Sequence, residues 1–472
     1  MTFHKNPGAG QSRAATKTAE RKQRRPGTAN RGLVLLIAST LLYAGIAEST
    51  DSWVKRYPEA RQQTNVACQQ KRLQECMDGL QELLALVDGR PDIRCLLATV
   101  EAQLGKQEAA LESLAVCARS QLDFAPLLSS PALQSVRSSQ AYSEIERIYH
   151  LGVKPAVDYE VHQSLGNPEL LTEDMTYDPA DNSFLVSSVR QRKVVRVAHG
   201  GKVSDVITSA QMPLWGMFAL ALDPQRHELW ATTTAVPQSP PFAKTDDGRS
   251  AVLRIDLRSH TLLGRYELSD GNPHAFGDMT LALDGGVFVA DGLGGGVYAV
   301  HPDRKEAFEV IVNPGVMRSP QTPALSPDGS TLLVPDYTRG IVKVNLRRGE
   351  PAWLTHQPEL ALFGIDGFYW QGHTLIAIQN GTTPPRILVL TLDKGCSNVS
   401  AWRVAIARAP GLGEPTHGVL RGKYFYFLAN SGWDRVDDSG QTVNAGAASP
   451  AAIWRMKLAK DDLTPSDCRQ PS

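Results

Sequence analysis

The segment DPADNSFLVSSVRQRKVVRVA, residues 178–198, contains the pattern that decides the fold. A turn signal, Asp178-Pro179, precedes a short apolar run, FLVSSV at 184–189, and a second run, KVVRVA, begins at Lys193. Short runs rich in β-branched residues and bounded by turn residues are typical of neighbouring strands. The segment is therefore expected to form two strands of an antiparallel sheet.

The same arrangement recurs toward the C-terminus with a period of about 45 residues. The later turn signals are Asp223-Pro224, Asp284-Gly285-Gly286, Pro327-Asp328-Gly329, Gln371-Gly372 and Arg421-Gly422, and each precedes a pair of strand-like runs. A sandwich would not repeat its turn chemistry at constant spacing, so six such units predict a mainly β fold, a six-bladed β-propeller over residues 155–460. The alternating segment Tyr159–Leu165 is expected to close the ring as the outermost strand of the last blade.

A small α-helical region is expected before the propeller, over residues 51–154. Apolar residues recur at helical spacing between 66 and 119, with breaks at 88–91 and 105–106, which predicts helices near 66–87, 92–104 and 107–119. The run LATVEAQLGKQEAAL, residues 97–111, resembles a tetratricopeptide repeat. Because one such repeat cannot bury its own faces, the region is expected to pack on the propeller or on a protein partner.

The N-terminus has the pattern of an export or anchoring segment. Residues 1–31 carry eight Lys and Arg against one acid, Glu20, and are read as a basic cytoplasmic flank. Residues 32–50 begin with the uncharged run Gly32–Ala47, which as a helix spans about 24 Å and falls short of a bilayer core of roughly 30 Å. A cleaved signal peptide and an uncleaved inner-membrane anchor both fit. Either one places the rest of the chain in the bacterial cell envelope, facing the periplasm.

Overall charge and cysteine content argue against several classes of function. The chain has 49 basic and 49 acidic residues, so no net field recruits nucleic acid, and no nucleic-acid partner is expected. Its six cysteines include no C-x-x-C pair, which favours disulfides over metal ligation or redox chemistry. Four of them, in the helical region, allow three pairings. Cys396 and Cys468 are expected to tie the late propeller to the tail at 461–472.

Candidate site residues lie where the innermost strand of each blade begins, because these positions ring one mouth of the central channel. Ionisable or amide side chains stand there in several blades: Glu173, Asp278, Gln321, Asp366 and His417. Converging carboxylates repel one another and need a counter-charge or a proton. Oxygen ligands from Glu173, Asp278, Gln321 and Asp366 suit Ca²⁺ best, with Mg²⁺, Mn²⁺ or Zn²⁺ as further possibilities. A hydrated polar channel is the alternative.

Two long loops are expected on the same face. Blade six carries the loop 431–450, with Trp433, and blade two carries the proline-rich insertion 235–249. Such loops on a rigid scaffold shape binding sites or are tolerated surface insertions. Asp and Asn also recur at the ends of the second strands, at Asp291, Asp336, Asn380 and Asn430. They are interpreted as architectural residues that bond turn amides.

Three motifs resemble the SMP-30/gluconolactonase/LRE-like family, and the resemblance spans most of residues 170–460. They are Glu173-x-x-x-Tyr177-Asp178-Pro179 with Phe184-Leu185-Val186, then Ser319-Pro320-Gln321-Thr322-Pro323-x-Leu325-Ser326-Pro327-Asp328-Gly329, and Asp366-Gly367-Phe368. The resemblance implies a propeller that binds a divalent cation and hydrolyses lactones or related esters. Glu173 matches the family's metal-binding glutamate, and Asp366 matches the aspartate that binds metal and acts as base. The chain departs from the family at Gln321 and at Gly277 beside Asp278, where the family has asparagines.

Two functions follow as hypotheses. The first is a divalent-metal-dependent lactonase or esterase-like hydrolase with Asp366 or His417 as proton acceptor, acting on a small molecule at the channel mouth. No G-x-S-x-G or H-E-x-x-H motif offers another hydrolytic centre. The second is a non-catalytic, NHL-like propeller that binds a ligand or a protein partner at the same mouth. For His417, a structural role and general base catalysis both stay open.

Overall fold

The structure is a computed structural model that describes residues 52–88, 90–153, 155–157, 159–443, 449–460 and 462. The described residues all belong to one compact unit. The basic flank, the expected signal or anchor at 32–50 and Cys468 of the expected Cys396–Cys468 bridge lie outside the described residues. None of the helices within the described ranges is long and apolar enough to cross a membrane.

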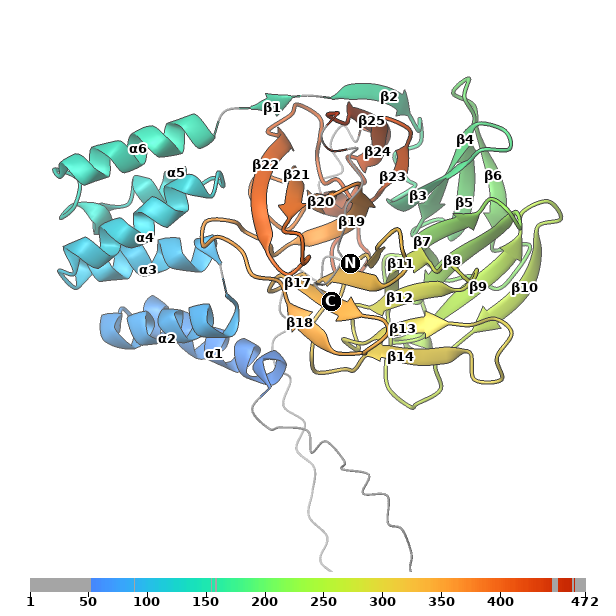
Figure 1. Cartoon of the computed structure of the whole chain (residues 1–472), viewed down its shortest axis with the longest axis horizontal. Coiled ribbons are helices and arrows are strands. Elements are labelled where there is room, and N and C mark those ends of the chain that lie inside the picture. The colour runs from blue at the N-terminus through green and yellow to red at the C-terminus, as the bar shows by residue number, and fades with distance from the viewer. Residues whose placement is uncertain are drawn as a thin grey trace, which may run out of the picture. The chain divides into compact units, whose positions relative to one another are not determined.

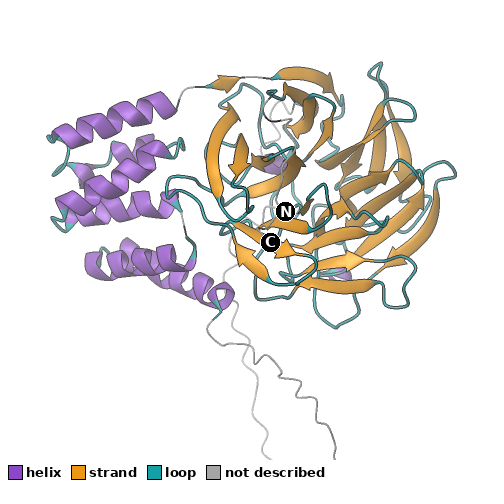
Figure 2. Ribbon diagram, in the orientation of Figure 1, coloured by secondary structure: helices purple, strands orange, loops and turns teal. Residues whose placement is uncertain are grey.

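Helices come first along the chain and strands follow (Figure 2). The helices are α1 (Trp53–Gln69), α2 (Leu73–Leu86), α3 (Pro91–Gln103), α4 (Gln107–Arg119), α5 (Ala125–Leu128) and α6 (Gln140–Gly152), with a 3₁₀ turn at Pro131–Leu133. Disulfides Cys68–Cys76 and Cys95–Cys117 join α1 to α2 and α3 to α4, which selects one of the three possible pairings. Buried small residues, Ala98, Ala102 and Ala110 among them, let α3 and α4 pack closely.

One helix prediction is wrong. The expected helix 66–87 is two helices, because α1 ends at Gln69 and Lys71 then adopts a left-handed backbone with φ of 55° before α2 begins. The N-terminal part of α1 was not predicted, since it is polar and contains Pro58. Its buried face, Tyr57, Ala60, Thr64 and Ala67, nevertheless keeps helical spacing.

The propeller has six blades, as predicted, and Figure 1 labels their strands. Blade one is β3 (Thr172–Asp178), β4 (Ser183–Ser188), β5 (Lys193–Val197) and β6 (Val203–Thr208). Blade two is β7 (Gly216–Asp223), β8 (Glu228–Thr234), β9 (Ser250–Asp256) and β10 (Thr261–Tyr266). Blade three is β11 (Phe276–Leu281), β12 (Val287–Asp291), β13 (Val297–Val300) and β14 (Phe308–Val312). Blade four is β15 (Ala324–Leu325), β16 (Thr331–Pro335), β17 (Ile341–Asn345) and β18 (Pro351–Trp353). Blade five is β19 (Ile365–Gln371), β20 (Thr374–Gln379), β21 (Arg386–Leu392) and β22 (Val399–Ala407), and blade six is β23 (Gly418–Arg421), β24 (Tyr424–Ala429) and β25 (Ala452–Lys457) with β2 (Glu160–Ser164).

The ring closes through β2, as the sequence predicted. Glu160 pairs with Arg455 and Ser164 with Ala452, so the first propeller strand completes the last blade. Tyr159 stacks on Trp454 with ring centroids 4.3 Å apart. A further short strand, β1 (Ala156–Val157), pairs with β22 and gives blade five a fifth strand.

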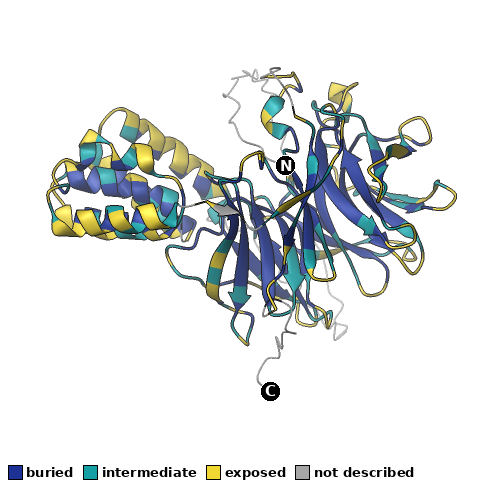
Figure 3. Cartoon of the chain, turned by 90° about the horizontal axis from the view of Figure 1, so that it is seen from above, coloured by how far each residue is buried: buried dark blue, intermediate teal, exposed yellow. Residues whose placement is uncertain are grey.

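The inner strands surround the channel and the outer strands face solvent. Each first strand contacts the first strand of the next blade, from β3 round to β23, and β23 contacts β3. Residues of the second strands are almost all buried because the sheets pack face to face, whereas every residue of the outer strands β10 and β2 is exposed or half-buried (Figure 3). This arrangement brings the first residues of all six inner strands to one mouth of the channel.

Candidate metal centre at the channel mouth

Irregular backbone at the start of the inner strands turns side chains into the channel. Pairing shifts register between Thr172 and Met175 in blade one, between Phe276 and Asp278 in blade three, and between Ile365 and Phe368 in blade five. A β-bulge of this kind re-aims the side chains beside it. These three bulges lie at the strand starts that carry Glu173, Asp278 and Asp366, and blade two has the same irregularity between Met217 and Leu220 without a carboxylate there.

Three of the predicted residues come together. Glu173, Asp366 and His417 each offer a ligand atom, and these atoms all lie within 4.8 Å of one another. All three side chains are buried. They originate in blades one, five and six, so only closure of the ring brings them together.

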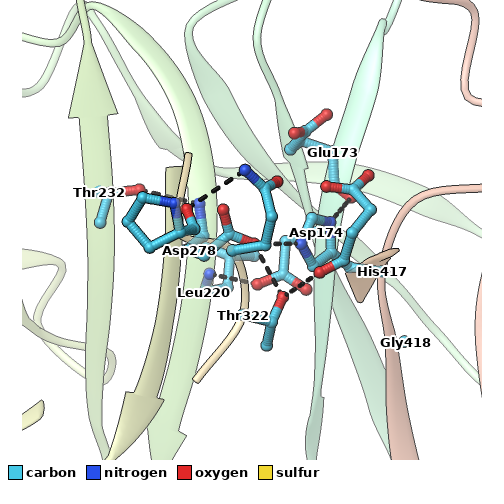
Figure 4. A network of polar contacts seen from close by, with 12 residues as sticks. Glu173, Asp174, Leu220, Thr232, Asp278, Thr322, His417 and Gly418 are labelled. Carbon is cyan, nitrogen blue, oxygen red and sulfur yellow. Dashed lines mark hydrogen bonds and ion pairs between the residues drawn. The ribbon is translucent and has the colours of Figure 1, made fainter. Parts of the chain in front are cut away.

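His417 is held by hydrogen bonds at both ring nitrogens. Nδ1 lies 2.9 Å from the backbone oxygen of Glu173, and Nε2 lies 2.7 Å from Oδ1 of Asp278 (Figure 4). Burial alone would lower the pKa of the imidazole, but the negative charges of Asp366 and Asp278 raise that pKa well above its ordinary value. In this arrangement His417 donates from both nitrogens and acts as a cation within the cluster.

Asp278 joins the cluster through its neighbours. Its Oδ1 also accepts a hydrogen bond of 2.7 Å from the hydroxyl of Thr322, which lies 2.8 Å from the backbone oxygen of Asp366. Asp278 is thus bonded to His417 and Thr322, while Glu173, Asp366 and His417 form the group with metal-ligand spacing.

Burial of the cluster disfavours the ionised forms of its carboxyl groups. Burial raises the pKa of Glu173 and of Asp366, and the mutual repulsion of their negative charges raises that of Glu173 further. Burial also raises the pKa of Asp174, the neighbour of Glu173, to about 7. A positive charge placed among these groups would stabilise their ionised forms.

Gln321 is oriented differently from the expected ligand. Its Nε2 lies 3.1 to 3.2 Å from Ser319 Oγ and from the backbone oxygens of Ser319 and Pro320, so the amide nitrogen faces its own loop. Its Oε1 is buried and, within the described part of the chain, has no hydrogen-bond partner. A ligand role for Gln321 stays a prediction.

Several residues of the site were not predicted from the sequence. Asn380 donates from Nδ2 to Oδ2 of Asp366 over 2.5 Å, so it is a site residue as well as an architectural one. Thr322 bridges Asp278 and Asp366, as described above. Trp433 donates its indole N–H to Oε2 of Glu173. The loop that holds Trp433 was predicted to lie at this mouth, but its contact with the carboxylate was not.

The interpretation as architectural residues that bond turn amides holds for Asp291 and Asp336, whereas Asn430 bonds backbone oxygens instead. Asp291 accepts bonds from the backbone of Ala275, Leu293 and Gly294, and Asp336 accepts four backbone bonds in the same way. Asn430 donates to the backbone oxygen of Ser449. For Asn380 the interpretation is incomplete, because its side chain reaches the candidate centre.

The two long loops meet beside the cluster. Nε2 of Gln238, in the blade-two insertion, donates to the backbone oxygen of Asp437 in the blade-six loop over 3.0 Å. Trp433, Val436 and Val236 pack in one apolar cluster with Phe218, and the rings of Phe218 and Trp433 lie 6.3 Å apart. These contacts form a roof, which we define as residues 235–249 and 431–443.

A pocket of about 640 Å³ is lined in part by roof residues and does not include the carboxylates of the candidate centre. Its lining includes Trp215, Phe242 and Arg249 from the loops of blade two and Arg265 from β10. The guanidinium groups of Arg249 and Arg265 lie 4.8 and 4.7 Å from the Trp215 ring centre. The residues of the candidate metal centre are not part of this lining.

Comparison with known proteins finds similar solved structures but no matching family model. No family model matches the chain, and no curated protein matches it. Solved structures similar to it include a gluconolactonase from Xanthomonas campestris, at 16% identity over 65% of this chain and 91% of that chain with a TM-score of 0.44. Another is regucalcin, a calcium-binding protein from Agrobacterium tumefaciens, at 16% identity over 66% and 98% of the two chains with a TM-score of 0.45.

A third is the PQQ-bound aldose sugar dehydrogenase from Streptomyces coelicolor, at 13% identity over 64% and 98% of the two chains with a TM-score of 0.43. The similar structures thus include proteins of the family that the sequence motifs resemble. Because the activities in these descriptions differ, the function of this chain has to be argued from its own residues.

Proposed function

We propose that this protein is a divalent-cation-dependent hydrolase of lactones or other carboxylic esters. The observation that carries the proposal is the convergence of Glu173 and Asp366, whose ligand atoms and that of His417 lie within 4.8 Å of one another at the channel mouth. Ligand atoms bonded to one ion at 2.0 to 2.4 Å lie no more than about 4.8 Å apart. The residues present therefore fit a cation.

The donor set bears on which cation binds. Two carboxylates suit Ca²⁺, Mg²⁺ or Mn²⁺, whereas an imidazole nitrogen favours Mn²⁺ or Zn²⁺. His417 Nε2 is hydrogen-bonded to Asp278 in this structure, so His417 becomes a ligand only if that hydrogen bond is broken and the nitrogen binds the cation instead. With His417 kept as a hydrogen-bond donor, an oxygen-rich Ca²⁺ site completed by waters and Gln321 Oε1 is the arrangement we propose.

The residues around the carboxylates have distinct roles in this proposal. A divalent cation held by Glu173 and Asp366 would polarise an ester carbonyl and make a water molecule more acidic. Asp366 would accept the proton of the attacking water and pass it to the alcohol oxygen as the ester C–O bond breaks, which gives a carboxylic acid and an alcohol. Asn380 fixes the orientation of the Asp366 carboxylate through Oδ2. His417 and Thr322 hold Asp278 in place and thereby shape the opposite wall.

A second function is favoured by the burial of the site. The side chains of Glu173 and Asp366 are each 1% exposed, and the roof contacts Glu173 through Trp433. A closed, cation-filled channel mouth suits a non-catalytic propeller that binds a ligand or a protein partner on its outer face. Turnover of an ester would require the roof to move.

The expected location and partners belong to the same proposal. We place the protein in the periplasm, either free after signal cleavage or held at the inner membrane by residues 32–50. Its substrate is a small molecule that enters at the channel mouth. The exposed face of the helical region is the surface proposed for a protein partner.

The test is calorimetric titration of the full chain with Ca²⁺, Mg²⁺, Mn²⁺ and Zn²⁺ after chelation, together with a panel of lactones and aryl esters. We expect one cation to bind at one site, and Glu173→Gln and Asp366→Asn to abolish both binding and hydrolysis. Glu306→Gln, at an exposed position between β13 and β14, is the matched control and should leave both unchanged.

The outcomes separate the two functions. Cation binding with turnover that requires both carboxylates supports the hydrolase. Cation binding without turnover of any ester supports the non-catalytic propeller. Absence of binding by all four cations would refute the metal centre, and with it the proposed mechanism.

A further inference from the structure

Arg386 is a fully buried cation with an incomplete set of partners. It begins β21, in blade five, and its side chain has no exposed surface. Its Nε donates to Oε1 of Gln379 over 2.7 Å, and Nη1 donates to the backbone oxygen of Ser120 over 2.8 Å. Nη2 is buried and has no hydrogen-bond partner in the described residues. A buried guanidinium without full pairing is costly, so this position calls for an explanation.

A second arginine, Arg408, is the charged side chain that acts on the pKa of Arg386. Arg386 pairs across the sheet with Ala407, and Arg408 is the next residue. In a regular strand the side chain of Arg408 would point to the opposite face, but its backbone is left-handed, with φ of 55°, which breaks that alternation. The Nη2 of Arg408 is also buried without a partner in the described part of the chain.

The protein supplies no anion to Arg386 within the described residues. Burial and the positive charge of Arg408 together lower the pKa of Arg386 to about 9. Asp123 faces Arg408, but its Oδ1 accepts bonds from Tyr149 and from the backbone of Ala125. The strand register thus places two arginines close together, and each has one Nη2 group without a hydrogen-bond partner in the described residues. Asp123 provides a negative charge to Arg408 but not to Arg386.

The surroundings place this pair at the contact between the helical region and blade five. Ser120, which accepts the bond from Arg386, follows α4, and Asp123 donates its backbone N–H to the oxygen of Thr383 over 2.8 Å. Leu122 packs with Ala361 and Phe363 in the same area. A negative charge bound by these arginines would therefore also stabilise the contact between the helical region and blade five.

We propose that a small inorganic anion, of the size of chloride, binds to the Nη2 groups of Arg386 and Arg408 and fastens the helical region to blade five. Both Nη2 atoms are buried, which excludes a bulky ligand, and an anion would satisfy donors on both side chains at once. This site is separate from the channel mouth, and it stands whether or not the protein hydrolyses esters.

The first test is crystallographic. Crystals of the full chain grown in gluconate and soaked in bromide should give an anomalous peak within hydrogen-bond distance of both Nη2 atoms. A water molecule at that position, without anomalous signal, would overturn the proposal.

The second test measures thermal unfolding as chloride replaces gluconate at constant ionic strength. Since substituting the fully buried Arg386 endangers folding itself, the variant is Arg408→Gln. Its matched control is Arg403→Gln, an exposed arginine of β22 that pairs with Asp462. Saturable stabilisation by chloride should persist in the control, and its apparent affinity should fall at least about tenfold in Arg408→Gln. An equal chloride response in the two variants would refute the site.

Discussion

Replacing Asp336 by alanine should destabilise the propeller strongly and weaken the candidate metal centre. Asp336 follows β16, is fully buried, and accepts four backbone hydrogen bonds. Its Oδ2 bonds the N–H groups of Arg318 and Ser319 at 2.6 and 2.9 Å. Its Oδ1 bonds those of Thr338 and Arg339 at 2.8 and 3.1 Å. The side chain therefore clamps two loops of blade four together.

The size of the effect follows from these four bonds. Each typical hydrogen bond contributes about 0.5 to 1.5 kcal/mol, so losing four costs about 2 to 6 kcal/mol in the free energy of unfolding. Asp336→Asn should cost about half of that, because the amide oxygen can serve one pair of N–H groups while the NH₂ group faces the other pair. The segment held through Arg318 and Ser319 leads to Thr322, so cation affinity should fall as well.

Urea denaturation of the full chain, followed by far-UV circular dichroism, measures the change in the free energy of unfolding. Calorimetric titration measures the change in cation affinity. Asp303→Ala, at an exposed position after β13, controls for the loss of one surface carboxylate. The reasoning fails if Asp336→Ala shifts the urea midpoint no more than Asp303→Ala does, or if Asp336→Asn is as damaging as the alanine variant.

Three further predictions concern other parts of the chain. Trp433→Phe removes the indole N–H from the candidate centre but keeps an aromatic ring, so it should change cation affinity in calorimetry with little effect on thermal stability. The hydrogen bond to Asp291 raises the pKa of His274, so the stability contributed by its protonated form is complete below about pH 6.5 and is lost as pH rises through the raised pKa; urea midpoints against pH should show that decrease. Cys95→Ser opens a loop of 22 residues to Cys117 and should lower stability by about 3 kcal/mol, measured by calorimetric unfolding.

Each of these has an outcome that would contradict it. Unchanged cation affinity in Trp433→Phe would mean that the indole does not act on the centre. A variant His274→Asn that still loses stability over the same pH interval would assign the decrease to another group. If adding a reductant to the wild-type chain left its unfolding temperature unchanged, the bridges would not contribute to stability.

Most of the propeller could be predicted because its signals are local and repeated. The strand pairs recur with the same turn chemistry, and the ring closure by β2 follows from the alternation in Tyr159–Leu165. By contrast, β1 has two residues, too few for any periodicity to show. The start of α1 was missed because helix propensity at Pro58 is poor, and packing of its buried face outweighs that propensity.

The candidate site could be predicted only in part, because side-chain direction depends on irregular backbone. The strand starts identified Glu173, Asp366 and His417, since position along each blade is encoded in the repeat. Which carboxylate bonds the histidine depends on bulges that have no sequence signature of their own. The contact of Asn380 with Asp366 links the end of β20 to the start of β19, and nothing in the local sequence distinguishes Asn380 from its architectural equivalents.

Closure of the ring by β2 has a consequence for how the protein folds. The ion pair between Glu160 and Arg455 joins residues 295 positions apart, so blade six cannot be completed until almost the whole chain has been synthesised. A chain that stops short of β25 leaves the edge of β24 unpaired and has no partner to offer β2. Since contacts between distant residues form slowly, the final pairing of β2 with β25 is expected to limit the rate of folding. The helical region, already emerged and cross-linked by its own bridges, would then hold β2 close to the place where its partner strand arrives.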